Sequence, residues 1–267
     1  TIQSMLTRLW CATSEPAAVK RTRGLGTMLS LALFLLMGVT GIAQTITLGG
    51  GALVATTTQN GNPVYRSSAT SGFGWAKSIQ LWTVGDLATL PSGSSITSIA
   101  FEKSTAATIA AGRTANMVIF MKNSSATALA AGTSWDAMTT GATQVFSNPV
   151  MGPADVPAAA GYWNIALGTS FVYTGGAVEV YISWDVNGAS SGLTTGGTPT
   201  AGAFQWLYGA SATAQSMGTS NTAIVPGTYT AWTVPSARRY NAQLTYVAGA
   251  PCVDPPTPGN TISSAAS

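Results

Sequence analysis

From Thr45 to Val247 the chain is a succession of short runs in which apolar and polar residues alternate, separated by Gly, Asn, Ser and Pro. In the clearest run, Ala177–Trp184, every second residue is Val, Ile or Trp. A period of two places these side chains on one face of a β-strand. No long stretch shows the 3.6-residue period of an amphipathic helix. The pattern predicts an all-β protein, an antiparallel β-sandwich of jelly-roll-like or immunoglobulin-like kind.

Further strands are expected at the other short apolar runs of this region. They are Thr45–Leu48, Ser78–Thr83, Ile96–Glu102, Ala115–Lys122, Thr143–Phe146, Tyr162–Leu167, Ala203–Tyr208, Tyr229–Val234 and Tyr240–Val247. Phe171–Tyr173, followed by Thr174-Gly175-Gly176, predicts a hairpin into Ala177–Trp184. Helix signals are few. We expect one or two turns at Val84–Leu90 and a short turn that begins at Trp135 with Ser134 as its cap.

The segment before the first strand has the features of a secretory signal peptide. Lys20, Arg21 and Arg23 precede the apolar run Met28–Val39, and small residues follow as far as Ala43. A basic region, about a dozen apolar residues and a small-residue exit form a signal peptide, whereas a transmembrane helix needs about 20 apolar residues. We therefore predict a signal-peptide helix within residues 1–44, with cleavage near Ala43 or Gln44. An uncleaved signal anchor and a buried core helix are the alternatives.

The basic character of the chain belongs to this segment alone. Of 11 Lys and Arg and 8 Asp and Glu, residues 1–44 hold four basic and one acidic, which leaves seven of each from Thr45 onward. A domain without net charge has no long-range attraction for nucleic acid, so we predict no nucleic-acid partner. The sequence contains no His, which excludes Ser-His-Asp triads and His-based zinc sites.

The composition changes again beyond residue 249, where Pro becomes frequent. We expect residues 45–249 to form the sandwich domain and residues 250–267 to form a Pro-rich linker and the start of a truncated second module. Removal of Cys11 with the signal peptide would leave Cys252 as the remaining cysteine of an exported chain. Its partner is then expected downstream of this sequence.

Several segments resemble, together, a known class of exported proteins. They are Ile96–Phe101, Met117–Leu129, Ser134–Asp136, Thr143–Phe146, Trp163–Gly176 and Val178–Asp185. They resemble the amino-terminal β-sandwich of large secreted or surface multidomain proteins of the Bacteroidota lineage, whose cargo often leaves by type IX secretion. In such proteins a stretch like Pro251–Thr261 often opens a fibronectin type III-like or immunoglobulin-like module. The resemblance implies a non-catalytic module and supplies no catalytic residues.

Tryptophans are the strongest candidates for a ligand site. Aromatic rings on a sandwich face stack on sugar rings in many carbohydrate-binding modules, because they offer a flat apolar face with a polar edge. Trp184 continues the apolar row of its strand and is expected in the core. Trp75 is the best candidate for exposure, followed by Trp135, although packing in the interior is favoured even for Trp75.

The carboxylates give no catalytic pair. Glu179 and Asp185 lie six residues apart on one strand face, about 20 Å if the strand is straight, whereas a glycosidase needs about 5–10 Å. We expect Asp86, Glu102, Asp136, Asp155, Glu179 and Asp185 to face solvent or lie in turns. Asp185-Val186-Asn187-Gly188 begins like a calcium loop, but the further oxygen ligands do not follow. A turn after the strand is favoured over calcium at Asp185 and Asn187.

These observations predict a non-catalytic structural or adhesion module of a larger secreted or cell-surface protein. No cofactor is expected, and the membrane is involved only through the signal peptide during export. The partner is expected to be an extracellular polysaccharide or a surface protein. A carbohydrate-binding module, which would show an exposed aromatic row, and an accessory domain of a secreted hydrolase whose catalytic domain lies beyond Ser267 stay open as alternatives.

Overall fold

The computed structural model describes residues 42–55, 61–64, 75–187, 193–195, 198–199, 204–221 and 235–249. These residues belong to the unit Gly41–Ser267 of the chain. Three predictions lie outside the described residues: the signal-peptide helix, the strand at residues 229–234 and the linker at residues 250–267. None of the helices in the described part of the chain is long and apolar enough to cross a membrane.

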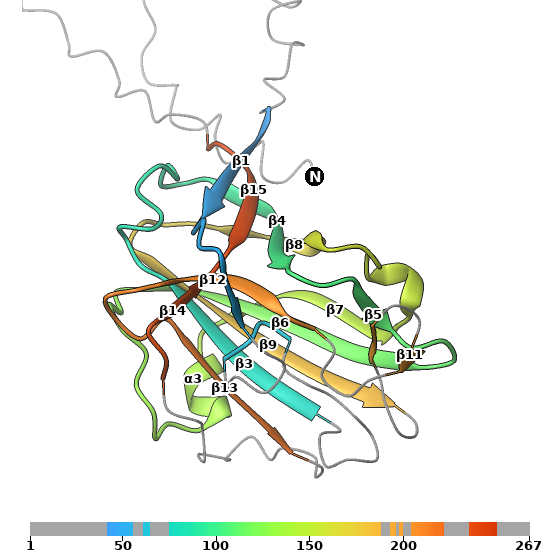
Figure 1. The fold of residues 1–267 in the computed structure, drawn as a ribbon. Coiled ribbons are helices and arrows are strands. Elements are labelled where there is room, and N and C mark those ends of the chain that lie inside the picture. Colours follow the sequence, from blue (N-terminus) through green and yellow to red (C-terminus); the bar gives the residue numbers. More distant parts are fainter. Residues whose placement is uncertain are drawn as a thin grey trace, which may run out of the picture. The chain divides into compact units, whose positions relative to one another are not determined.

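Strands make up nearly all of the regular structure, as expected from the alternation in the sequence (Figure 1). They are β1 (Ala43–Leu48), β2 (Leu53–Ala55), β3 (Trp75–Trp82), β4 (Ser95–Lys103), β5 (Ala107–Ile109), β6 (Thr114–Ser124), β7 (Thr143–Met151), β8 (Gly161–Val172), β9 (Ala177–Asn187), β10 (Leu193–Thr195), β11 (Thr198–Pro199), β12 (Trp206–Ala210), β13 (Ser216–Asn221), β14 (Arg238–Tyr240) and β15 (Ala242–Val247). The helical elements are α3 (Trp135–Thr139) and the 3₁₀ turn η1 (Pro153–Asp155).

The strands form two large antiparallel sheets. One has five strands in the order β13-β3-β9-β6-β7. The other has seven, with the path β1-β15-β4-β12-β14, while β2 pairs with β12 and β8 with β4. The short strands β11, β10 and β5 form a small third sheet. The prediction of an all-β antiparallel sandwich is confirmed.

The core lies against the face of β9 that the alternation predicts. Val178, Val180, Ile182 and Trp184 are all buried in the main hydrophobic cluster together with residues of the other sheet. Aromatic rings form its centre: Trp163 stacks on Phe204 with ring centroids 5.8 Å apart. Offset and edge-to-face contacts of this kind add to the free energy gained from burial alone.

The predicted hairpin between Phe171–Tyr173 and Ala177 is wrong. Gly175 and Gly176 do form a turn with positive φ angles of 99° and 84°. However, β8 pairs with β4 in the seven-stranded sheet, and β9 pairs with β3 and β6 in the five-stranded sheet. The two glycines therefore carry the chain from one layer of the sandwich to the other. A turn motif determines the local reversal but not the sheet that the next strand joins.

The turn predicted to start at Asp185 does not start there, and Gly188 lies outside the described residues. Strand β9 continues to Asn187, and Asp185 is paired with Trp75 on β3 and with Asn116 on β6. Pairing on both sides keeps the backbone of Asp185 extended, whatever its own turn propensity. The predicted helical turns at Val84–Leu90 are instead a series of turns, although Leu87 N–H does donate to Thr83 O.

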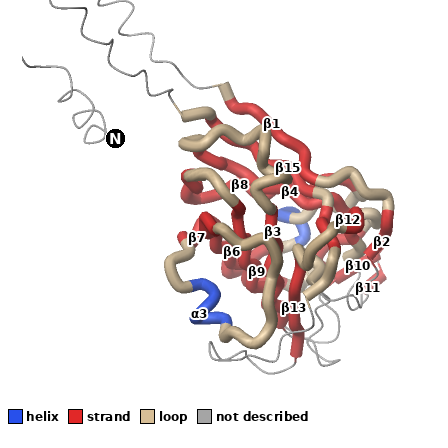
Figure 2. The backbone as a smooth tube through the Cα atoms, turned by 90° about the vertical axis from the view of Figure 1, so that its left-hand side faces the viewer, coloured by secondary structure: helices blue, strands red, loops and turns tan. Residues whose placement is uncertain are grey.

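The short helix α3 begins where the sequence predicts. The Ser134 side chain accepts a hydrogen bond from the N–H of Ala137, and Asp136 lies in the first turn. This satisfies one of the donors that a helix start leaves without a partner. Figure 2 shows α3 on the outer side of the five-stranded sheet, away from β4 and β12.

The predicted strand Tyr240–Val247 is interrupted at Asn241, which separates β14 from β15. The Asn241 side-chain oxygen accepts hydrogen bonds from Gly50 N (2.9 Å) and Gly51 N (3.0 Å). A Cβ atom at Gly51 would lie 2.2 Å from the carbonyl oxygen of Tyr208. Asn241 therefore holds the Gly49-Gly50-Gly51 segment where it passes close to the backbone of Tyr208. A glycine is required at Gly51, because a side chain there would clash with that backbone.

Candidate functional site

Trp75 and Trp135, the two tryptophans with the best prospect of exposure, are both buried. Their exposed fractions are 4% and 6%. The Trp135 ring lies edge-on to Tyr181 (5.8 Å between centroids), and the ammonium of Lys77 lies 4.2 Å from its centre. Neither ring offers an open face for a sugar, so the possibility of stacking on Trp75 or Trp135 is not supported. The preference for packing agrees with the structure.

Asp185 and Asn187, the candidate calcium ligands, lie along a paired strand and not in a loop. Burial raises the pKa of Asp185, while the neighbouring ammonium of Lys77 lowers it. No group of three or more His, Cys, Asp or Glu side chains able to hold a metal ion occurs among the described residues. Within the part of the chain that the structure describes, no set of ligands therefore lies together around Asp185.

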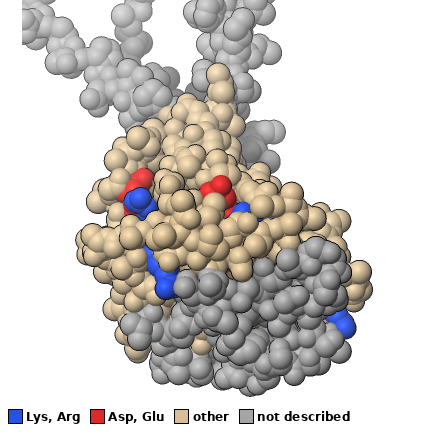
Figure 3. Space-filling model, viewed as in Figure 1, with Lys and Arg blue, Asp and Glu red and all other residues tan. Residues whose placement is uncertain are grey.

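Several carboxylates that were expected to face solvent or lie in turns bind other side chains of the protein. Asp86 binds Arg239, and Glu102 accepts from the amide of Asn241 at 2.8 Å. Figure 3 shows isolated charged groups on the face in view, with no continuous patch of one sign among the described residues. Asp86 lies in a turn, as one of the two expected settings, although its side chain is buried, whereas for Glu179, a largely buried side chain within β9, the expectation is wrong.

The two adjacent arginines also have structural partners. Arg239 forms the ion pair with Asp86, and the Arg238 guanidinium lies 5.3 Å from the centre of the Tyr208 ring. A guanidinium over an aromatic face is a favourable contact. Both side chains therefore fix β14 against its neighbours.

A second, smaller hydrophobic cluster covers the outer face of the five-stranded sheet. Residues 125–142, which we call the strap, run over this face and include α3. The cluster is formed by Ile79, Trp135, Tyr181 and Met217, with Leu129 and Met138 among the partly buried residues packed against it. The outer face of this sheet is therefore apolar in the middle, although the alternation in β9 suggests a polar face.

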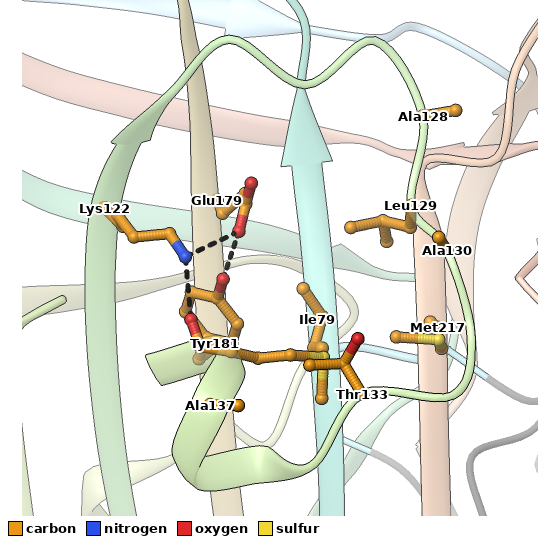
Figure 4. Close-up of a pocket in the computed structure, with 11 residues that line it drawn as sticks. Ile79, Lys122, Ala128, Leu129, Ala130, Thr133, Ala137, Glu179, Tyr181 and Met217 are labelled. Carbon is orange, nitrogen blue, oxygen red and sulfur yellow. Dashed lines mark hydrogen bonds and ion pairs between the residues drawn. The ribbon is translucent and has the colours of Figure 1, made fainter. Parts of the chain in front are cut away.

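Between the strap and the sheet lies a pocket of about 260 Å³, which we call the outer pocket (Figure 4). Its floor includes Ile79, Tyr181 and Met217 from three neighbouring strands. The strap supplies the rim through Leu129, Thr133 and other residues, with Lys122 and Glu179 at one side. The complete lining is Ile79, Lys122, Ala128, Leu129, Ala130, Thr133, Ala137, Met138, Glu179, Tyr181 and Met217.

The polar side of the outer pocket is a hydrogen-bonded group centred on Glu179. Ser124 Oγ donates to Glu179 Oε1 at 2.5 Å, and the Tyr181 hydroxyl donates to Oε2. Lys122 Nζ lies 3.4 Å from Oε2 and donates to the carbonyl oxygen of Met138 at 2.7 Å. Burial, the hydrogen bond to Glu179 and the charge of Glu179 all raise the pKa of Tyr181. The phenol therefore stays a neutral donor at physiological pH.

Lys77 and Lys122 each lie over an aromatic ring in or next to the strap. Lys77 lies over Trp135, and Lys122 lies 5.3 Å from the centre of the Tyr181 ring, while the two rings contact each other edge to face. Each ammonium is attracted by the ring that it covers. Lys77 holds the strap at Trp135 and Lys122 holds it at Met138 O, so the outer pocket has a defined wall.

Lys103 is a buried cation near the main aromatic cluster. Its Nζ donates to the carbonyl oxygens of Ala107, at 2.6 Å, and of Pro157, and lies 5.7 Å from the centre of the Phe204 ring. Burial lowers the pKa of Lys103 to about 8. No ion pair with a carboxylate is found for it among the described residues. The carbonyl contacts tie β4 to the segments after it, which is a structural role.

A smaller pocket of about 190 Å³ opens between β7 and β8, next to Phe146, Asp155 and Trp163. Asp155 is engaged in η1, where its side chain accepts from Gly152 N at 2.6 Å. The outer pocket, with an ion pair and a phenol hydroxyl in its lining, is the stronger candidate site.

Reasoning from the sequence did not identify Lys122 or Ser124. Lys122 and Glu179 are directly paired across β6 and β9, and Ser124 stands opposite Ala177. In the sequence, Lys122 and Ser124 are visible only as polar positions at or just after the end of a predicted strand. Whether they lie beside Glu179 depends on the register between β6 and β9, which are distant in the sequence. Comparison with protein-family models, with curated proteins and with solved structures gave no match.

Proposed function

We propose that this chain is a non-catalytic structural or adhesion module of a larger secreted or cell-surface protein. The observation that supports the proposal best is that the charged and aromatic side chains are used to build the framework. Asp86, Glu102 and Lys103 bind groups of the protein itself, and Trp75 and Trp135 are buried. A rigid two-sheet framework with a neutral surface suits a spacer or a platform that presents binding surfaces.

Export is supported by the distribution of charge and hydrophobicity in the sequence. The basic residues Lys20, Arg21 and Arg23 followed by the apolar run Met28–Val39 favour the Sec pathway. We propose that the sandwich acts outside the cell, and the resemblance to Bacteroidota surface proteins extends this proposal to a type IX secretion cargo with a following fibronectin type III-like module.

Expression of the full chain in a bacterial host tests the proposal. We expect a mature chain that starts at or near Gln44, measured by mass spectrometry, and that is found in the periplasmic or external fraction. A variant lacking residues 20–39 is the control and should stay in the cytoplasm at full remaining length. An uncleaved wild-type chain in the cytoplasm would contradict export.

The adhesive role needs a separate measurement. Beads coated with the exported chain should bind to immobilised extracellular polysaccharides or to intact cells more than beads coated with an unrelated neutral β-sandwich. Equal retention of the two kinds of bead would leave only a spacer role. Hydrolysis of a supplied polysaccharide by the purified chain would contradict the non-catalytic assignment.

A further inference from the structure

The outer pocket places a hydrogen-bonded polar group, which also helps to hold the strap, beside a space between the strap and the sheet (Figure 4). We propose that the outer pocket binds two neighbouring hydroxyl groups of a single pyranose ring, such as the terminal residue of a glycan. This inference names a binding site in addition to the structural role and does not depend on stacking by Trp75 or Trp135.

The hydrogen-bonding positions that remain unused at Glu179 and Lys122 match a ligand with two neighbouring hydroxyl groups. An ionised carboxylate has about four acceptor positions, and an ammonium has three donors. Glu179 Oε2 receives Tyr181 and Lys122, whereas Oε1 receives only Ser124 among the described residues. Lys122 uses donors for Met138 O and Glu179. One acceptor position of Glu179 and one donor of Lys122 are left, on two groups 3.4 Å apart, which fits a hydroxyl that donates and a neighbouring hydroxyl that accepts.

The charge balance of the site disfavours ionic ligands. An anion near Lys122 also meets the carboxylate of Glu179, and a cation near Glu179 also meets the ammonium, with the two groups 3.4 Å apart. A purely apolar ligand would cover this pair without replacing its water contacts, which is unfavourable. A neutral ligand rich in hydroxyl groups satisfies the remaining donor and acceptor at no such cost.

The size and the apolar side of the pocket fit one sugar ring. Its volume of about 260 Å³ is below the range of about 300–1,000 Å³ that is typical of sites for drug-sized ligands. Leu129, which is partly buried, lines the part away from Glu179 together with the buried side chains of Ile79 and Met217, and a pyranose has C–H groups to place against Leu129. The small volume and the single polar side favour a chain end rather than the middle of a polysaccharide.

The rim of the pocket is built in advance. The capped helix α3 carries Ala137 and Met138, and Met138 O is fixed by Lys122. Gly132 and Gly141, with φ angles of 94° and 76°, allow the sharp turns on the two sides of α3. A ligand therefore enters without an ordering cost for the strap.

Simple ring compounds provide the direct test. We expect cyclohexane-1,2-diol to shift the NMR signals of Lys122, Ala137 and Leu129 in the full chain, and cyclohexanol to bind at least tenfold more weakly. Among glucose, galactose, mannose and N-acetylglucosamine, at least one should bind more tightly than the diol. Equal binding of the diol and cyclohexanol, or shifts by inorganic phosphate as large as those by the sugars, would overturn the proposal.

Variants of the site separate binding from folding. Glu179→Gln and Lys122→Met should each weaken binding of the preferred sugar at least tenfold, and Ala137→Leu should abolish it by filling the pocket. Arg113→Met and Asp136→Asn are charge-matched controls outside the pocket lining and should bind like the wild type. Unfolding midpoints measured on all five show which variants are folded. A folded Ala137→Leu variant that binds normally would place the sugar elsewhere.

Discussion

Asp86 and Arg239, 153 positions apart in the sequence, form an ion pair that joins the turns after β3 to β14. Asp86 Oδ2 also accepts from the Thr83 N–H at 2.9 Å, from the Thr83 hydroxyl at 2.8 Å and from Gln215 Nε2 at 2.5 Å. Burial raises the pKa of Asp86, but these hydrogen bonds and that from Arg239 outweigh burial, so its pKa lies below the ordinary value. Asp86 therefore stabilises the fold in its charged form.

The first prediction is that Asp86→Asn lowers the free energy of unfolding at pH 7 by about 2 kcal/mol, since it removes a buried charge that several donors face. Because the pKa of Asp86 is lower in the folded state, its contribution is present above the unfolded pKa of about 3.9 and is lost as pH falls through the folded pKa. Urea unfolding at pH 7 and pH 3 measures this. The difference between variant and wild type should shrink at pH 3, and Asp136→Asn should show a small effect at both.

The second prediction concerns Lys103, whose pKa burial lowers to about 8. Between this value and the unfolded pKa of about 10.4, the unfolded chain binds more protons, so stability rises with pH. We expect the free energy of unfolding to increase by roughly 2 kcal/mol from pH 7 to pH 9.5. Lys103→Met should lose most of this increase, with the remainder due to Lys77, whose pKa is also lowered by burial. A wild-type profile that falls over this range would contradict the assignment.

The third prediction concerns Asn241, whose amide donates to Gly51 O and to Glu102 Oε2, both at 2.8 Å. Asn241→Asp replaces this donor with an oxygen that faces two acceptors, so we expect a loss of about 2–3 kcal/mol at pH 7. Protonation of the new carboxyl restores a donor, and the loss should therefore decrease near pH 4. Chemical denaturation measures both values, with Asn164→Asp at an exposed position of β8 as the control. Similar losses for the two variants would contradict the role of Asn241.

The fourth prediction separates the two hydrophobic clusters. Trp135→Ala removes the ring between Lys77 and Tyr181, and we expect faster hydrogen exchange in residues 125–142 while the sheets keep their protection. Trp163→Ala removes the ring that stacks on Phe204 and Trp206, and we expect a global loss of about 3–5 kcal/mol. Hydrogen exchange with mass spectrometry distinguishes the local from the global change. Faster exchange throughout the sheets of Trp135→Ala would show that the strap is part of the main folding unit.

The parts of the fold that could be predicted are those determined by local periodicity and capping. The apolar row from Val178 to Trp184 is buried as expected, and Ser134 caps α3. The extent of β9 and the sheet that each strand joins could not be predicted, because they depend on pairing between distant segments. Asp185 stays in β9 because strands on both sides pair with it.

Less of the candidate site than of the fold could be predicted from the sequence. Glu179 was visible as a polar residue on the outer face of a strand, but its partners Lys122 and Ser124 belong to another strand more than fifty residues away. The strap converts that face from a solvated surface into a covered one. Hydrophobic residues such as Leu129 and Met138 lie in a segment without a regular period, so no pattern shows which face they cover.

The pairing of the first strand with the last one has a mechanical consequence. Strands β1 and β15 run antiparallel with Ala43 opposite Val247 and Leu48 opposite Ala242 (Figure 1). The backbone therefore enters and leaves the sandwich at the same end of this strand pair. A force that pulls the two flanking segments apart acts first on the hydrogen bonds near the Ala43–Val247 pair. It then separates the two strands one residue pair at a time. In a tethered protein these two strands would act as a low-force extensible link that yields before the aromatic core does.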